Sequence, residues 1–120
     1  MISVIRAALA AAALTASVSA ALASASTTPT NYQPDPALKT ETMSQLTARV
    51  RNACGVTQAK LQNASESSVR RPCECYAGRT MRSLSPEEVQ AYRDTGVFND
   101  TARAKAVAAL DACQLARPAM

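Results

Sequence analysis

Four cysteines constrain the fold of this 120-residue chain more than any other feature of its sequence. They are Cys54, Cys73, Cys75 and Cys113. In a short exported chain an even number of cysteines indicates disulfides, and four cysteines allow three pairings. In a reducing compartment the same residues would instead suggest metal binding or thiol chemistry. The destination of the chain therefore decides how its cysteines are interpreted.

The first 25 residues have the three-part order of a secretory signal peptide. Arg6 follows the amino terminus, residues 7–23 are uncharged and mostly alanine, and three A-x-A-like cleavage sites fall within 18–25. A membrane-spanning helix usually needs about 20 apolar residues, and this run is shorter and weakly hydrophobic. We therefore predict a bacterial signal peptide over 1–25, with a retained anchor or buried helix as the alternative. The mature chain would be periplasmic or secreted, without a transmembrane segment.

Export would leave about 95 residues, enough for one domain whose core is small and only marginally stable unaided. Residues 26–35 are rich in Ser, Thr, Pro and Asn and show no apolar period, so we predict a flexible leader there. The remaining residues, 36–120, form the predicted domain.

Apolar residues recur every three or four positions in the domain, which predicts helices, and no period-two alternation indicates a sheet. The first helix begins at Pro36 or near Thr40 and ends before 63–68, although Gly55 weakens its second half. Its apolar stripe is Met43, Leu46, Val50, Ala53/Cys54, Thr57 and Leu61. The second helix opens at Pro72, with Cys73, Tyr76/Ala77, Thr80/Met81 and Leu84 on one face. The fourth follows a cap at Asn99 or Asp100, has Ala106/Val107, Leu110 and Cys113 on its inner face, and ends at Pro118.

The third helix has the clearest start in the chain. Ser85 and Glu88 match a capping box, in which each side chain accepts from the other residue's backbone N–H, and a proline follows Ser85 at the first helical position. Gly96 is placed to end the helix in the left-handed conformation, with Val97 packing on Tyr92 in a Schellman motif. The predicted fold is all-α, a small up-and-down array of about four helices stabilised by two disulfides.

This arrangement of helices reduces the number of possible disulfide pairings. The end of the first helix, the start of the second and the end of the fourth meet at one pole of an alternating array, and the four cysteines occupy these places. Cys73 and Cys75 point about 200° apart, because each helical residue turns by 100°. One of them should therefore pair with Cys54 and the other with Cys113, and the sequence leaves open which does which. Each bond is worth roughly 3–4 kcal/mol in the chain-entropy model.

Two other roles for the cysteines remain as alternatives. A helix N-terminus lowers thiol pKa values, so Cys73 and Cys75 could form a thiol-redox pair with Cys54–Cys113 structural. The same C-x-C could hold Cu(I), which soft thiolates select. A four-thiolate zinc site would prefer C-x₂-C arms, which are missing.

Several function classes are disfavoured by composition. Histidine is absent, which excludes the usual acid–base residue near neutral pH and every His-based metal site. From residue 26 onward 12 Lys and Arg face 9 Asp and Glu, and only four aromatic side chains are present, so nucleic-acid binding is not expected. No glycine-rich phosphate loop or nucleophile elbow occurs. We predict no catalytic residue, cofactor or metal.

The pattern Cys54…Cys73-Glu74-Cys75…Ser85-Pro86-Glu87-Glu88…Cys113 loosely resembles uncharacterised small exported bacterial proteins that share a C…C-x-C…(S/T)-x-x-E…C arrangement. The likeness covers about residues 43–115 and implies a fold without implying an activity.

The leading hypothesis is an exported structural or protein-binding protein of the bacterial cell envelope, without catalysis. Its partner is an unknown envelope protein, and its oligomeric state is open. The alternative is a periplasmic thiol-redox or Cu(I)-binding protein that uses Cys73 and Cys75. A third hypothesis is binding of anionic lipid through four arginines: Arg70, Arg71, Arg79 and Arg82.

Overall fold

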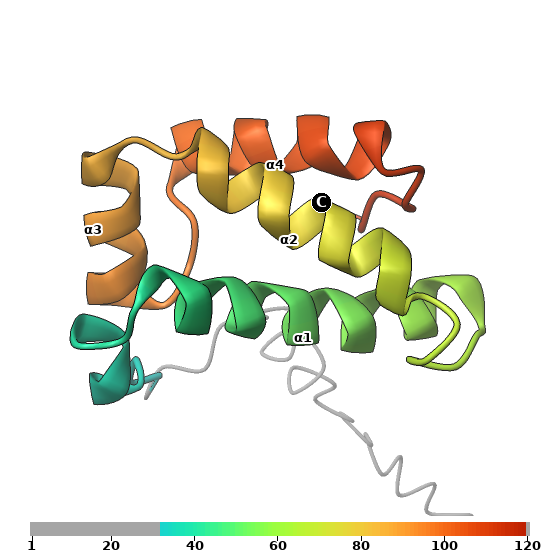
Figure 1. Ribbon diagram of the computed structural model, residues 1–120, viewed down its shortest axis with the longest axis horizontal. Coiled ribbons are helices and arrows are strands. Elements are labelled where there is room, and N and C mark those ends of the chain that lie inside the picture. Colours follow the sequence, from blue (N-terminus) through green and yellow to red (C-terminus); the bar gives the residue numbers. More distant parts are fainter. Residues whose placement is uncertain (1–31, 120) are drawn as a thin grey trace, which may run out of the picture. The chain divides into compact units, whose positions relative to one another are not determined.

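The computed structural model describes residues 32–119 (Figure 1). Within this range the chain forms one short 3₁₀ helix, four α-helices and no strand. They are η2 (Pro36–Lys39), α1 (Met43–Gln62), α2 (Arg70–Ser83), α3 (Pro86–Thr95) and α4 (Asp100–Ala112). The predicted all-α class is confirmed. The signal peptide predicted over 1–25 and most of the leader predicted over 26–35 lie outside the described residues.

Three of the helices alternate in direction, and the fourth crosses them (Figure 1). α2 lies between α1 and α4 and packs against both, whereas α3 stands across the end at which α2 finishes and mainly contacts η2. The predicted up-and-down order is therefore correct for α1, α2 and α4 and wrong for α3. Hydrogen bonds from one arginine hold α3 in this crossed position. Arg93 on α3 donates hydrogen bonds to the carbonyl oxygens of Leu38 (2.8 Å) and Glu41 (2.7 Å), which tie α3 to the start of the domain.

The sequence predicted two alternative starts for the first helix, and a separate element begins at or near each of them: η2 at Pro36 and α1 at Met43. The Asp35 side chain caps η2 by accepting from the backbone N–H of Ala37 at 2.9 Å. α1 begins later, at a capping box between Thr42 and Gln45. The Gln45 N–H donates to Thr42 Oγ1 at 3.1 Å, and the Thr42 N–H donates to Gln45 Oε1 at 2.9 Å.

The buried face of α1 matches the predicted stripe at Leu46, Val50 and Cys54, whereas Met43 and Ala53, also predicted to be buried, are exposed. The helix continues through Gly55, and its buried residues are Leu46, Val50, Cys54, Gly55 and Gln58. Beyond Cys54 the stripe is wrong, because Thr57 and Leu61 are exposed and Gln58 is buried instead. The second half of α1 faces the segment that follows α4. This segment presents backbone N–H and carbonyl groups, so a side-chain amide, that of Gln58, is buried against it.

The start and the buried face of α2 are close to the prediction. The helix begins at Arg70, before the predicted Pro72, which fits in the first turn because the N–H groups there have no helical acceptor. Its buried residues are Cys73, Ala77, Thr80 and Met81.

The end of α3 corrects a detail of the cap. Gly96 is left-handed (φ 75°) and donates to the carbonyl of Tyr92 at 2.7 Å, as predicted. Val97, however, is 54% exposed, and its N–H bonds to Thr95 Oγ1, so the cap is the simpler αL motif and not a Schellman motif. Phe98 packs on Tyr92 in place of Val97, with ring centroids 5.1 Å apart.

α4 is capped by Asn99, whose side chain accepts from the Ala102 N–H, and it ends at Ala112, well before the predicted Pro118. The stop is a full Schellman motif without glycine. Gln114 takes the left-handed conformation (φ 57°) and donates to the carbonyl of Asp111, and the Leu115 N–H bonds to the carbonyl of Leu110.

The core consists of two clusters of buried side chains. The first is Leu38, Leu46, Val50, Ala77, Met81 and Tyr92, and the second is Cys54, Val69, Cys73, Leu110, Cys113 and Leu115. Tyr76 packs against both clusters. Since three members of the second cluster are cysteines, cysteine side chains form part of the apolar interior at this end.

Candidate functional site

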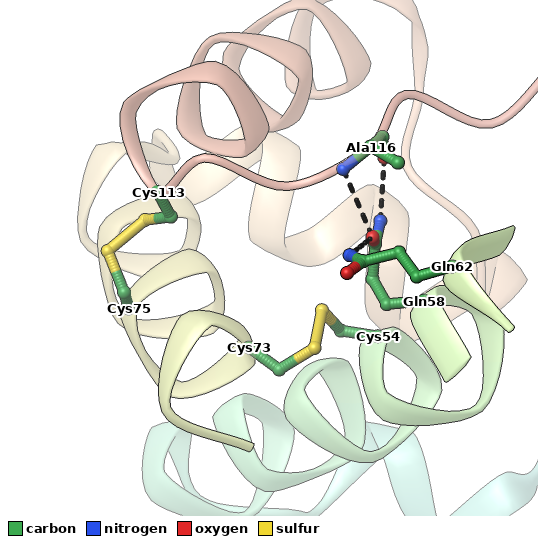
Figure 2. Close-up of a disulfide and its surroundings, with 7 residues drawn as sticks. All are labelled: Cys54, Gln58, Gln62, Cys73, Cys75, Cys113 and Ala116. Carbon is green, nitrogen blue, oxygen red and sulfur yellow. Dashed lines mark hydrogen bonds between the residues drawn. A yellow bond between two sulfur atoms is a disulfide. The ribbon is translucent and has the colours of Figure 1, made fainter. Parts of the chain in front are cut away.

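Two disulfides join the three alternating helices. Cys54 on α1 is bonded to Cys73 on α2, and Cys75 on α2 is bonded to Cys113 at the end of α4 (Figure 2). Cys73 is only 1% exposed and faces the core, whereas Cys75, two residues further along, is exposed. The structure thus resolves the pairing that the sequence left open, because the buried face of α2 is turned toward α1.

The C-x-C pair is therefore divided between two bonds. Cys73 and Cys75 are not bonded to each other, and the chain has no free cysteine. Among residues 32–119, no three His, Cys, Asp or Glu side chains come together as a metal site. This arrangement does not favour the redox-pair or Cu(I) alternatives.

A groove of about 470 Å³ lies between α1 and α4, the two helices that flank α2. α1 and α4 barely touch each other, so the space between them is not filled by direct helix packing. Its walls come from all four α-helices and the loop before α4, and their apolar side chains include Val50, Tyr76, Tyr92, Phe98, Ala106, Val107 and Leu110. A concave, mainly apolar site of this size is typical of ligand-binding pockets.

The groove is bounded by two segments that lack regular structure. The loop after α3 contributes Gly96, Val97 and Phe98. The segment 113–118, which follows α4, contributes Arg117 and Pro118. We call this second segment the strap, because it turns back from α4 toward α1 (Figure 2).

The buried amide of Gln58 ties the strap to α1. Its Nε2 donates to the carbonyl of Ala116 at 2.6 Å, and its Oε1 accepts from the Ala116 N–H at 3.1 Å (Figure 2). Gln62 donates to the same Oε1 at 2.7 Å. Gln58 is 1% exposed, so these bonds satisfy an amide that would otherwise be costly to bury. Sequence reasoning missed this residue, since a lone glutamine in a helix gives no signal of a buried partner.

The charged side chains that line the groove are positive. Two arginines, Arg103 and Arg117, line it, and no Asp or Glu of the described residues does. Arg117 pairs through both Nε and NH2 with Asp111 outside the groove, which raises the pKa of Arg117 and lowers that of Asp111. Arg103 has a weaker partner, because its NH1 lies 3.7 Å from Asp100, whose side chain is 99% exposed.

The predicted capping box lies away from this groove and is structural. The Glu88 N–H donates to Ser85 Oγ at 3.1 Å, and the Ser85 N–H donates to Glu88 Oε1 at 2.8 Å. Lys105 on α4 adds a bond of 2.5 Å to the same oxygen and another of 3.0 Å to the carbonyl of Ser83. The Lys105 ammonium, together with the Ser85 N–H, lowers the pKa of Glu88 to about 2. Glu88 therefore joins α3 to α4 as well as capping α3, a link that the sequence did not reveal.

No helix within residues 32–119 is long and apolar enough to cross a membrane. No family model, curated protein or solved structure matches the chain.

Proposed function

We propose that this chain is an exported, non-catalytic binding protein of the bacterial cell envelope, and that the groove between α1 and α4 is its binding site. The observation that carries the proposal is the groove itself: an open apolar space between two helices that α2 holds apart. A concave, mainly apolar space between the helices of a small bundle is a typical place for a ligand to bind.

The walls of the groove are held in place before any ligand arrives. One disulfide fixes α1 to α2, the other fixes α4 to α2, and Gln58 fixes the strap to α1. A site ordered in advance loses less conformational entropy on binding, which favours affinity. The two disulfides also support the expectation of an oxidising compartment, periplasmic or extracellular.

The partner that the sequence predicts is another envelope protein, and this stays a prediction. The groove supplies the place at which an apolar group of a partner would enter, and its lining within residues 32–119 includes no acidic side chain that would repel an anionic one.

Binding of Nile red, a neutral dye whose fluorescence rises in apolar surroundings, tests the groove. We expect the mature, oxidised protein to bind the dye. Ala53 lies on the groove wall and is exposed, so Ala53→Phe should fill the groove without disturbing the core, and it should weaken binding by about tenfold or more.

The matched control is Ala108→Phe, which places the same side chain at an exposed site of α4 outside the groove lining. The control should bind the dye like the unaltered protein. Equal binding by the two variants, or no binding by the unaltered protein, would reject the groove as the binding site.

A further inference from the structure

We propose that the ligand of the groove is a single-chain anionic amphiphile, with its acyl chain along the apolar walls and its anionic head group at Arg103. This rests on the proposed function, because it requires the groove to be the binding site. It assigns a small molecule in place of the protein partner predicted from sequence.

The dimensions and lining of the groove fit an acyl chain. A volume of about 470 Å³ is in the range of small-molecule sites. The polar side chains in its lining are few, and the most deeply buried of them, Gln58, uses its amide on the strap. Burial raises the pKa of the Tyr76 hydroxyl, so this side chain adds no charge to the wall. The interior therefore offers contact to methylene groups and little else.

The charged residues of the groove lining indicate the charge of the head group and the place at which it binds. Of the described residues, Arg103 and Arg117 are the only charged ones that line the groove, and both are positive. Arg117 already uses Nε and NH2 on Asp111. Arg103 has only a contact of 3.7 Å with an almost fully exposed Asp100, so its guanidinium keeps most of its donors for a ligand. A carboxylate or phosphate can accept two parallel hydrogen bonds from such a group.

The two arginines also orient the ligand. Arg103 lies in the first half of α4, beside the loop 96–98, and Arg117 lies on the strap beyond the end of the same helix. A head group at Arg103 therefore sends the chain along α4, past Ala106 and Leu110, toward the strap.

The test uses three ligands that share the same acyl chain length and differ in the charge of the head group, which is negative, neutral or positive. The mature, oxidised protein is loaded with Nile red and titrated with laurate and lauroylcholine below their micellar concentrations, and with lauryl alcohol below its solubility limit. We expect laurate to displace the dye at the lowest concentration and lauroylcholine at the highest. Raising the ionic strength should weaken the binding of laurate and leave the binding of lauryl alcohol unchanged, because salt screens an exposed ion pair.

Arg103→Gln should weaken the binding of laurate by about tenfold, which is the effect expected from the loss of one charge-assisted hydrogen bond. It should leave the binding of lauryl alcohol unchanged. The matched control is Arg79→Gln, at an exposed arginine of α2 outside the groove lining, which should change neither. Lysophosphatidylglycerol, titrated in parallel, distinguishes a lipid source from a free fatty acid.

The outcomes separate this inference from the proposed function. If the alcohol and laurate compete equally, or if Arg103→Gln behaves like Arg79→Gln, the anionic ligand class is wrong and the groove remains a binding site. If Nile red does not bind at all, the proposed function fails and this inference fails with it.

Discussion

Single polar side chains carry the connections that apolar packing leaves incomplete in this domain. Gln58 holds the strap, Arg93 holds α3 to the start of the domain, and Glu88 holds α3 to α4. Each connects segments that are far apart in the chain or belong to different helices. In a small core such polar contacts have a large influence, because net stability is a small difference between large terms.

Replacing the Gln58 amide tests its role in the strap. Gln58→Met keeps the length of the side chain and leaves the N–H and carbonyl of Ala116 without their partners. We expect the free energy of unfolding, from urea denaturation, to fall by about 2 kcal/mol, since each lost hydrogen bond costs about 1 kcal/mol.

The control is the same substitution at Gln90, an exposed residue of α3 whose amide bonds only to the exposed side chain of Asp94. Gln90→Met should change stability by less than about 0.5 kcal/mol. Equal effects of the two substitutions would mean that the strap is not held by the Gln58 amide.

Protonation of Glu88 should weaken the domain at low pH. Its pKa is lowered from 4.5 to about 2, first by Lys105 and then by the Ser85 N–H, so the ionised form is stabilised by folding. The stability that Glu88 supplies is therefore fully present above pH 4.5 and is lost as the pH falls through about 2. Glu88→Gln keeps the cap and removes the charge, so it mimics the protonated state.

We expect Glu88→Gln to lower the urea midpoint clearly at about pH 7 and to have only a small effect near pH 2. Glu87→Gln, at the exposed neighbour, should leave the midpoint unchanged at both pH values. A difference between Glu88→Gln and the unaltered protein that does not shrink with falling pH would contradict this role.

At the scale of the helices, α2 is the element on which the others depend. It packs against α1 and α4, and one covalent bond runs to each. The bonds differ in exposure, because Cys54 and Cys73 are both buried whereas Cys75 is exposed. The sequence separations of 19 and 38 residues correspond to about 3 and about 4 kcal/mol in the chain-entropy model.

Limited reduction should therefore open the two disulfides in order. With a low concentration of dithiothreitol at native pH, we expect Cys75 and Cys113 to become reactive before Cys54 and Cys73, since a thiolate must reach the sulfur that it attacks. Alkylation of the freed thiols followed by peptide mass spectrometry reads the order. In urea the two bonds should open together, which serves as the control. Simultaneous opening under native conditions would show that exposure does not govern their reactivity.

Local signals in the sequence predicted the starts of α3 and α4 and the ends of α1 and α3, but not the end of α4. The Ser85–Glu88 box and the Asn99 cap depend on contacts within one turn, so their residue types are sufficient to identify them. The end of α1 before Asn63 was predicted from the polar run 63–68, whereas the Schellman stop of α4 was missed, because Gln114 takes the left-handed position without being glycine. At Gln114 the stop accompanies the burial of Leu110 and Leu115 in the second core cluster, which residues of α1 and α2 complete.

At the scale of the described domain, one groove and two core clusters share the same small set of helices. Sequence periodicity predicted the class, the number of helices and the gathering of the cysteines. It did not predict the crossing of α3, which depends on the Arg93 hydrogen bonds to the carbonyls of Leu38 and Glu41. It also did not predict the groove, which depends on which faces remain unpaired after α2 has packed against two neighbours. A pattern of apolar residues identifies a face that will be buried, but not the distance between the helices that bury it.

Export itself is tested on the whole protein. We expect the protein recovered from the native compartment to lack about the first 25 residues and to have a mass four hydrogens below that of its reduced form, as two disulfides require. Intact-mass spectrometry before and after reduction measures both. The cytoplasmic form, made without residues 1–25 in a reducing host, is the control and should carry four thiols when the cells are lysed under alkylation. Free thiols in the exported protein would refute the oxidised state.

The opposite orientation of Cys73 and Cys75 has a consequence for oxidative folding. The exchanged pairing, Cys54 with Cys75 and Cys73 with Cys113, would require α2 to rotate by about 200° about its axis. That rotation would turn the exposed Arg71 and Arg79, one turn on either side of Cys75, toward the interior. Burying unpaired guanidinium groups is costly, so the scrambled isomer cannot compete at equilibrium. A thiol catalyst that reshuffles the bonds will therefore convert chains with the exchanged pairing into the native isomer.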